Sequence, residues 1–293
     1  MNALRWKKFF LSLVALPLMV WAAGTPTLAQ DSPPVQVTPA VEVSHYDVSW
    51  FKDMPVTFLS AFTAFFGNYR YTQMEKPEPG DYRSVSELLP WDRSLAGRYS
   101  ESADKASKWA AALGVAPLAL AGYSYGVGDA SGLDAAGFAL MFAQALALQS
   151  GINLMVRSME FWPRPYVYAK DGYGSGSRKA VERAEKADAE AYGSFFSGHA
   201  SAAFTVAVFT GEWFSEMYPQ SPFRGVVWAG ALSAAALEGV LRIAAGKHYP
   251  TDVVVGALVG SGVSLAVIEI HKKRDERFSL WVYPGAAGLT IRI

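Results

Sequence analysis

The sequence contains no cysteine, little histidine and no excess of charge of either sign. Of its 293 residues, none is cysteine and four are histidine, while 26 Lys and Arg balance 26 Asp and Glu. The absence of cysteine excludes disulfides, thiol catalysis and cysteine-based metal sites. The balanced charge provides no basic surface of the kind that binds nucleic acid, so we expect no nucleic-acid partner.

Apolar residues, by contrast, are abundant, and they begin close to the N-terminus. Hydrophobic residues make up 51% of the chain, and the run from Phe9 to Ala23 follows a basic head that ends at Lys8. Small residues follow up to Ala29, which is typical of a bacterial signal peptide spanning residues 1–29. An uncleaved anchor is the alternative, although the run is shorter than the ~20 residues of a spanning helix.

The rest of the sequence predicts an all-α helical bundle with additions at both ends. Residues 30–108 form an aromatic-rich N-terminal extension, expected to be strand or irregular structure over a helical core. Residues 109–270 form the helical domain, because they contain five long segments without charge, separated by loop residues. Residues 271–293 form a short tail whose alternation predicts a strand that pairs with the N-terminal region, or that docks to an outer-membrane partner.

Two of the five uncharged segments are short for a membrane-spanning helix. Residues 200–211 and 225–237 contain 12 and 13 uncharged positions, whereas crossing the hydrocarbon core takes ~20 residues. We therefore expect a periplasmic bundle associated with the membrane surface. The alternative is an integral inner-membrane protein with its site facing the periplasm, for which the distribution of basic residues also argues.

Three short stretches contain the residue types needed to move a phosphoryl group. They are Arg157…Arg164-Pro165, Ser197-Gly198-His199 and Arg242…His248…Asp252. Arginine forks neutralise and orient phosphate oxygens. One imidazole can attack phosphorus while the other gives a proton to the departing oxygen. With three arginines placed for the phosphate, we expect neither a metal nor another cofactor.

The order and spacing of these stretches resemble the signature of the type-2 phosphatidic acid phosphatase and vanadium haloperoxidase superfamily. The resemblance covers residues 140–260 and departs from the signature at three positions. Arg157 stands where the family usually has lysine, Phe196 replaces a proline and Leu241 replaces a serine. Phe196 affects how the loop enters the following helix, and Leu241 removes one hydroxyl donor to the phosphate. None of the three changes removes a histidine.

The resemblance implies a role for each residue of the three stretches. His248 would be the nucleophile, with Asp252 holding its other ring nitrogen. His199 would be the general acid and then the general base. The phosphate would be bound by the side chains and backbone of Arg157, Arg164, Ser197, Gly198 and Arg242.

Structural roles are the alternatives for some of these residues. His248 and Asp252 would then be a residue before a helix and an acid stabilised by the helix dipole. Ser197 would be a helix N-cap, which is compatible with phosphate binding. Arg242 would pair with Glu238 four residues earlier. The two remaining histidines, His45 and His271, are expected at the surface.

The segment between the first two stretches differs in character from the rest. It combines a glycine-rich loop over residues 170–177 with a charged run of helix formers over residues 178–190. The loop lacks the Gly-Lys-Ser/Thr of a phosphate-binding P-loop. Two interpretations of this segment are open. It is either a solvated helix with Glu182 paired to Lys186 or a lid over the substrate.

Together these observations predict a phosphatase of the cell envelope that acts on a phosphomonoester or pyrophosphate. A phosphorylated lipid is the expected substrate, and a small phosphoester is the alternative. A vanadate-dependent haloperoxidase is a second hypothesis, because vanadate would occupy the same residues. A non-catalytic relative is the third, and the intact His199, His248 and Asp252 argue against it.

Overall fold

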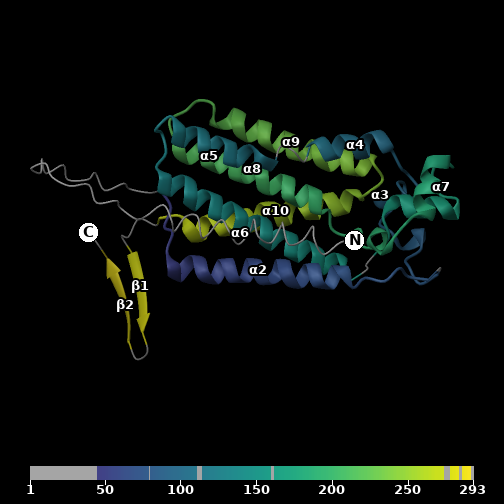
Figure 1. Cartoon of the computed structure of the whole chain (residues 1–293), viewed down its shortest axis with the longest axis horizontal. Helices are drawn as coiled ribbons and strands as arrows, with labels where there is room; N and C mark the ends of the chain where they lie inside the picture. The colour runs from purple at the N-terminus through teal and green to yellow at the C-terminus, as the bar shows by residue number, and fades with distance from the viewer. Residues whose placement is uncertain are drawn as a thin grey trace, which may run out of the picture.

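The computed structural model describes residues 45–78, 80–110, 114–159, 162–273, 278–283 and 286–291. The expected signal peptide, residues 1–29, lies outside the described residues. Long helices lie side by side along the molecule (Figure 1). They are α2 (Trp50–Thr72), α6 (Gly132–Arg157), α8 (Gly198–Met217), α9 (Arg224–Ala244) and α10 (Pro250–His271).

Two shorter helices, α4 (Glu101–Ala110) and α5 (Ala116–Gly126), complete the bundle. Helix α4 packs against α9, and α5 packs against α8 and α6. The remaining short elements lie near one end of the bundle (Figure 1). They are η1 (Val85–Glu87), α3 (Pro90–Arg93), η3 (Pro165–Asp171), α7 (Arg178–Glu185) and η4 (Ala189–Tyr192).

Local sequence signals explain where several helices begin. Ser131 caps α6 by accepting a hydrogen bond from the backbone of Asp134, and Ser197 does the same for α8 from the backbone of Ala200. Pro250 occupies the first turn of α10, where the fixed φ of proline suits a helix start and its missing N–H is not needed. These caps matter because α8 and α10 both begin at the same end of the bundle.

The core combines aromatic packing with close approaches of helix backbones. Phe138 of α6 packs against Phe209 and Trp213 of α8. Helices α2 and α6 meet at Gly67 and Gly151, where a Cβ added to Gly67 would lie 2.4 Å from the carbonyl oxygen of Gly151. A side chain at either position would therefore separate two helices that pack along much of their length.

The aromatic N-terminal region is helical, which corrects the expectation of strand or irregular structure. Its aromatic residues recur at helical spacing, and Phe58, Phe62 and Phe66 stack on one another along α2. The region is also no separate covering, because α2 packs against α6. The expected boundary at residue 109 cuts through α4, so the bundle begins earlier in the chain than the composition indicated.

His271 is buried, which corrects the expectation of a surface histidine. The residue is 0% exposed, and its Nε2 lies 3.0 Å from Oδ1 of Asp53 in α2. Its Nδ1 lies 2.7 Å from the carbonyl oxygen of Val267. The partner carboxylate is 218 residues away in the chain, so no local pattern could have indicated this pair. His45, in contrast, is exposed as expected.

The tail forms a two-stranded antiparallel hairpin, β1 (Phe278–Tyr283) and β2 (Ala286–Ile291). The predicted strand therefore exists, but its partner in the sheet is the adjacent strand. The described N-terminal and C-terminal regions are joined by a bridge between Tyr46 and Lys272, beside the contact of His271 with Asp53.

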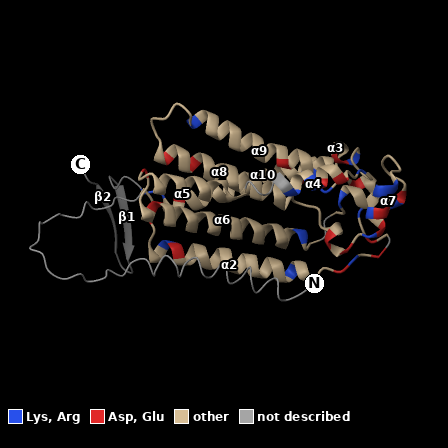
Figure 2. Cartoon of the chain, turned by 45° about the horizontal axis from the view of Figure 1, so that its top comes forward, with Lys and Arg blue, Asp and Glu red and all other residues tan. Residues whose placement is uncertain are grey.

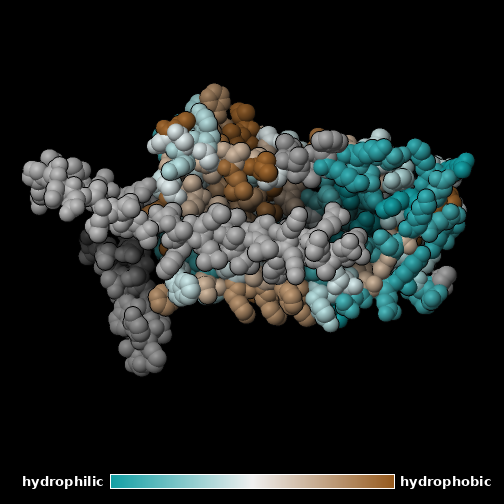
Figure 3. Space-filling view, viewed as in Figure 1, coloured by the Kyte–Doolittle hydropathy of each residue, from teal (hydrophilic) through white to brown (hydrophobic). Residues whose placement is uncertain are grey.

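The surface of the bundle is divided between charged ends and an apolar middle. Lys, Arg, Asp and Glu gather at the end that carries α3 and α7, with a smaller group at the opposite end (Figure 2). Hydrophobic residues cover much of the described surface between them (Figure 3). Phe51, Phe58 and Leu258, for example, are 88%, 70% and 67% exposed.

Such exposure of large apolar side chains is characteristic of contact with lipid or a partner. Among the described helices, α6, α9 and α10 are each long and apolar enough to cross a membrane. Their length and composition indicate association with a membrane.

Candidate active site

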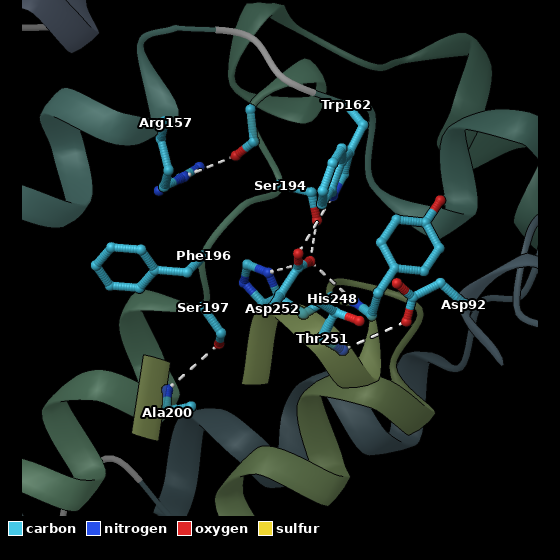
Figure 4. Close-up of polar contacts among 12 residues, drawn as sticks. Asp92, Arg157, Trp162, Ser194, Phe196, Ser197, Ala200, His248, Thr251 and Asp252 are labelled. Carbon is cyan, nitrogen blue, oxygen red and sulfur yellow. Dashed lines mark hydrogen bonds and ion pairs between the residues drawn. The ribbon is translucent and has the colours of Figure 1, made fainter. Parts of the chain in front are cut away.

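The three stretches singled out in the sequence meet at the charged end of the bundle, each at a helix terminus. Arg157 is the last residue of α6 and Gly198 is the first of α8. Arg242 lies in the last turn of α9, and Asp252 in the first turn of α10. His248 lies in the loop between α9 and α10. Figure 4 shows Ser194, Trp162 and His248 gathered around Asp252, with Arg157 and Ser197 to one side.

The carboxylate of Asp252 is at this centre and is 0% exposed. Its Oδ2 accepts hydrogen bonds from Ser194 Oγ at 2.6 Å and from the backbone N–H of Tyr249 at 2.9 Å. Its Oδ1 accepts from Nε1 of Trp162 at 3.2 Å (Figure 4). A buried carboxylate is tolerated when donors surround it in this way, so its position is closely defined.

His248 is oriented by this carboxylate. Its Nδ1 lies 3.4 Å from Asp252 Oδ2, and the residue is 2% exposed. With Nδ1 carrying the proton toward the carboxylate, the lone pair of the neutral ring is on Nε2. Burial, followed by the positive charges of Arg164, Arg242 and Arg157, lowers the pKa of His248 well below its usual range. The ring is consequently neutral at pH 7, as a nucleophile must be.

Ser197, Gly198 and His199 form the start of α8. Ser197 is buried and its Oγ accepts from the backbone of Ala200 at 3.3 Å, so the N-cap role is present. Gly198 has no room for a side chain, because a Cβ would lie 2.6 Å from Oδ1 of Asn153. His199 is exposed and lines a cavity beside α8. The first turn of α8 thus presents its backbone N–H groups and one imidazole at the same end as His248.

Arg157, Arg164 and Arg242 all interact electrostatically with His248, and Arg157 and Arg242 are held in different ways. Arg157 donates from Nε to the carbonyl oxygen of Gly193 at 2.8 Å and stacks over the ring of Tyr71. Arg242 is 4% exposed and donates from one terminal nitrogen to Ser107 Oγ at 2.9 Å and to Asp104 Oδ1 at 3.4 Å.

The remaining donors of two arginines point to an anion. In the described part of the chain, the Nε atoms of Arg164 and Arg242 are buried without a hydrogen-bond partner. Arg164 also contributes positive charge at both His248 and Arg242. Guanidinium groups gathered in this way repel one another unless an anion lies between them, and a phosphate has the charge and the acceptor oxygens to do so.

Several residues that support the site were not foreseen. Asp104 and Ser107 of α4 hold Arg242, in place of the expected partner Glu238. Ser194 and Trp162 hold Asp252. Helical spacing brought only Glu238 within reach of Arg242, and the contact with α4 spans 138 positions in the chain.

The loop before α8 is held by Asn153, which also lay outside the expected site. Asn153 Nδ2 donates to the carbonyl oxygen of Phe196 at 2.6 Å. Phe196, which replaces the proline of the family signature, is 2% exposed. Its side chain therefore belongs to the core, and its backbone helps to set the entry into α8.

The glycine-rich and charged segment packs beside the site without a visible metal or phosphate motif. Helix α7 packs on η3 through Ala180 and Ala184, which contact Ala169. Its ion pair joins Arg178 to Glu182 at 2.8 Å, which replaces the expected pair with Lys186. The segment is a packed, surface-charged helix in this conformation.

A cavity of about 480 Å³ begins at His199 and continues between α8 and α9. Most of its lining is small and apolar, such as Ala202, Ala203, Val206 and Ala231. Its size lies within the ~300–1,000 Å³ common for ligand pockets. An apolar cavity lined at one end by His199, which itself interacts electrostatically with His248 and the three arginines, suits a ligand with an anionic head and a hydrocarbon portion.

The comparison with known proteins agrees with the sequence signature. Residues 136–276 match the family model described as PAP2 superfamily, which is consistent with the type-2 phosphatidic acid phosphatase superfamily. No curated protein and no solved structure matches the chain significantly. The family match supports a phosphatase that acts on a phosphoester.

The lowered pKa of His248 makes a testable prediction about pH. Only the neutral ring can attack phosphorus, so protonation of His248 should set the acid limb of kcat/KM. That limb should lie below the ordinary histidine pKa of ~6.5, after correction for ionisation of the substrate. Replacing Arg164 with Gln removes a positive charge and should move the limb to higher pH. A wild-type limb at or above pH ~6.5, unmoved by Arg164→Gln, would contradict the assignment.

Proposed function

We propose that the protein is a metal-independent phosphatase that hydrolyses a phosphomonoester or pyrophosphate of a lipid through a phosphohistidine intermediate. The observation that carries this proposal is the convergence of His248 and the partly unpartnered arginines on His199, which lines one end of an apolar cavity. The anionic head would lie among the arginines and the apolar portion along α8 and α9.

The first chemical step would transfer the phosphoryl group to His248. Its Nε2 attacks phosphorus as the bond from phosphorus to the leaving oxygen breaks, and protonated His199 gives its proton to that oxygen. Asp252 keeps the proton on Nδ1 and stabilises the positive charge that develops on the ring. Arg157, Arg164 and Arg242 stabilise the negative charge on the equatorial oxygens.

The second step would release inorganic phosphate. His199, now neutral, takes a proton from a water molecule as that water attacks phosphorus. The bond from phosphorus to Nε2 breaks, so that His248 returns to its neutral form and His199 to its protonated form. Both histidines are thus used twice, and the two steps regenerate the starting enzyme.

The apolar cavity favours a lipid phosphatase over a vanadate-dependent haloperoxidase. A haloperoxidase would use the same arginines and histidines to hold vanadate, but halide and peroxide are small and polar. The lining by Ala202, Ala203, Val206 and Ala231 is instead suited to a hydrocarbon leaving group.

We also propose that the bundle is embedded in the membrane, with the site at one surface. The argument for a soluble bundle depended on short uncharged segments, yet the helices extend beyond them. Helix α8 has 20 residues and α9 has 21, which at 1.5 Å per residue gives each a length of about 30 Å. Exposed residues such as Phe58 and Leu258 would then face lipid tails. The signal-like N-terminus supports placement in the cell envelope with the site toward the periplasm.

Trapping the intermediate tests the proposed chemistry. Purified protein should release phosphate from a ³²P-labelled lipid phosphate, and acid-sensitive, base-stable label should remain on the protein after rapid quenching. His248→Ala should abolish both the label and turnover, because no other group can occupy the position of Nε2. His45→Ala, a histidine at the opposite end of the bundle, is the matched control and should retain both. Near-normal turnover by folded His248→Ala protein would overturn the assignment.

Membrane fractionation tests the embedded arrangement. The protein should remain in the inner membrane after washing with alkaline carbonate and should require detergent for extraction, because its apolar middle would otherwise face water. A periplasmic marker protein should be released in the same wash. Recovery of the protein in the osmotic-shock fluid, soluble without detergent, would instead support the bundle at the membrane surface.

A further inference from the structure

Glu238 is the charged residue of the cavity that the proposed chemistry does not use. It lies in α9 and lines the same cavity as His199. The residue is 3% exposed, and neither carboxylate oxygen has a hydrogen-bond partner among the residues that the structure describes. Burying a carboxylate without a hydrogen-bond donor costs free energy. Glu238 therefore points to a ligand that supplies the donor.

The nearest candidate partner within the protein is engaged elsewhere. Arg242 lies one helical turn from Glu238, at the spacing at which such pairs commonly form. Its terminal nitrogen is instead directed to Ser107 and Asp104 of α4. Glu238 therefore does not hold the arginine that we assign to phosphate binding. Its carboxylate is left facing small apolar residues such as Ala202 and Ala203 across the cavity.

The position of Glu238 limits where on a ligand the donor can lie. Four residues separate it from Arg242, which corresponds to a rise of about 6 Å along the helix. A ligand whose phosphate meets Arg242 and whose chain follows α8 would pass Glu238 within a few bonds of the leaving oxygen. The interacting group is therefore in the part of the lipid between the phosphate and the hydrocarbon chain.

We propose that Glu238 accepts a hydrogen bond from a hydroxyl or amide N–H next to the phosphoester oxygen of the lipid. This proposal rests on the proposed function and specifies its substrate class. The enzyme would prefer lipid phosphates that keep a donor at this position, such as single-chain glycerol phosphates with a free hydroxyl. Lipids in which that position is esterified or absent would leave the carboxylate unpaired and would react more slowly.

A matched pair of substrates tests this preference. The probes are 1-oleoylglycerol 3-phosphate, which has a free 2-hydroxyl, and its 2-deoxy analogue with the same chain. Wild-type protein in detergent micelles should show a kcat/KM at least about 10-fold higher for the hydroxyl lipid, the effect expected of one hydrogen bond to a charged group. Glu238→Leu should bring the ratio close to one.

Glu238→Gln should keep part of the preference, because its amide oxygen still accepts a hydrogen bond. Thermal unfolding of both variants in detergent monitors folding, and neither should be destabilised, since the lost carboxylate has no partner to leave unpaired. Turnover of both lipids at equal rates by wild-type protein, or an unchanged ratio in Glu238→Leu, would overturn the role of Glu238 while leaving the proposed phosphatase intact. Turnover of neither lipid, with no phosphohistidine formed, would overturn both.

Discussion

The buried carboxylate of Asp252 is the group on which the site end of the bundle depends. Its side chain accepts from Ser194, Trp162 and the backbone of Tyr249. Its own backbone carbonyl accepts from the N–H of Ser197 at 3.0 Å. One residue therefore joins the first turn of α10 to the loop before α8 and to the segment after α6.

The site end of the bundle also contains a surplus of buried positive charge. Three arginines and a lysine lie near His248, and the carboxylates of Asp104, Glu238 and Asp252 offset their charge only in part. Lys247 is held 3.6 Å from Asp104, and burial, with the positive charge of Arg164, lowers its pKa to about 8. The surplus positive charge is unfavourable in the empty protein and becomes favourable when a phosphate binds. The site is therefore organised around an anion.

The charged and apolar parts of the molecule match the two parts of the proposed ligand. Charged residues are concentrated at the end that holds the arginines (Figure 2). The apolar cavity leads away from that end between α8 and α9. A lipid phosphate has the same division within one molecule. The proposed orientation of substrate follows from matching polar to polar and apolar to apolar, without any further assumption.

Much of this could be predicted from the sequence where the determining pattern is local. The spacing of Arg157, Arg164, His199, His248 and Asp252 indicated a common site, and the fold gathers these residues at helix ends. The all-α class followed from long uncharged segments. The helix at residues 50–72 departs from the expected strand, because dense aromatics favour strands while their period of about four is helical.

The residues that could not be predicted depend on contacts between distant segments. The burial of His271 requires α2 to pack beside the end of α10, and the capture of Arg242 by Asp104 requires α4 to pack on α9. For Glu238, helical spacing favoured a pair with Arg242, and the structure leaves it facing a cavity. In each case tertiary packing determined which of several plausible local pairs forms.

The central claim is that arginines and histidines, without a metal ion, transfer the phosphoryl group. It is tested most directly by phosphate release from a lipid phosphate in excess EDTA, with and without vanadate. The account predicts an unchanged rate in EDTA, because the charge on the phosphate is met by Arg157, Arg164 and Arg242. It also predicts inhibition by vanadate, which adopts the geometry of the transferring group. Loss of activity in EDTA that magnesium or zinc restores would contradict it.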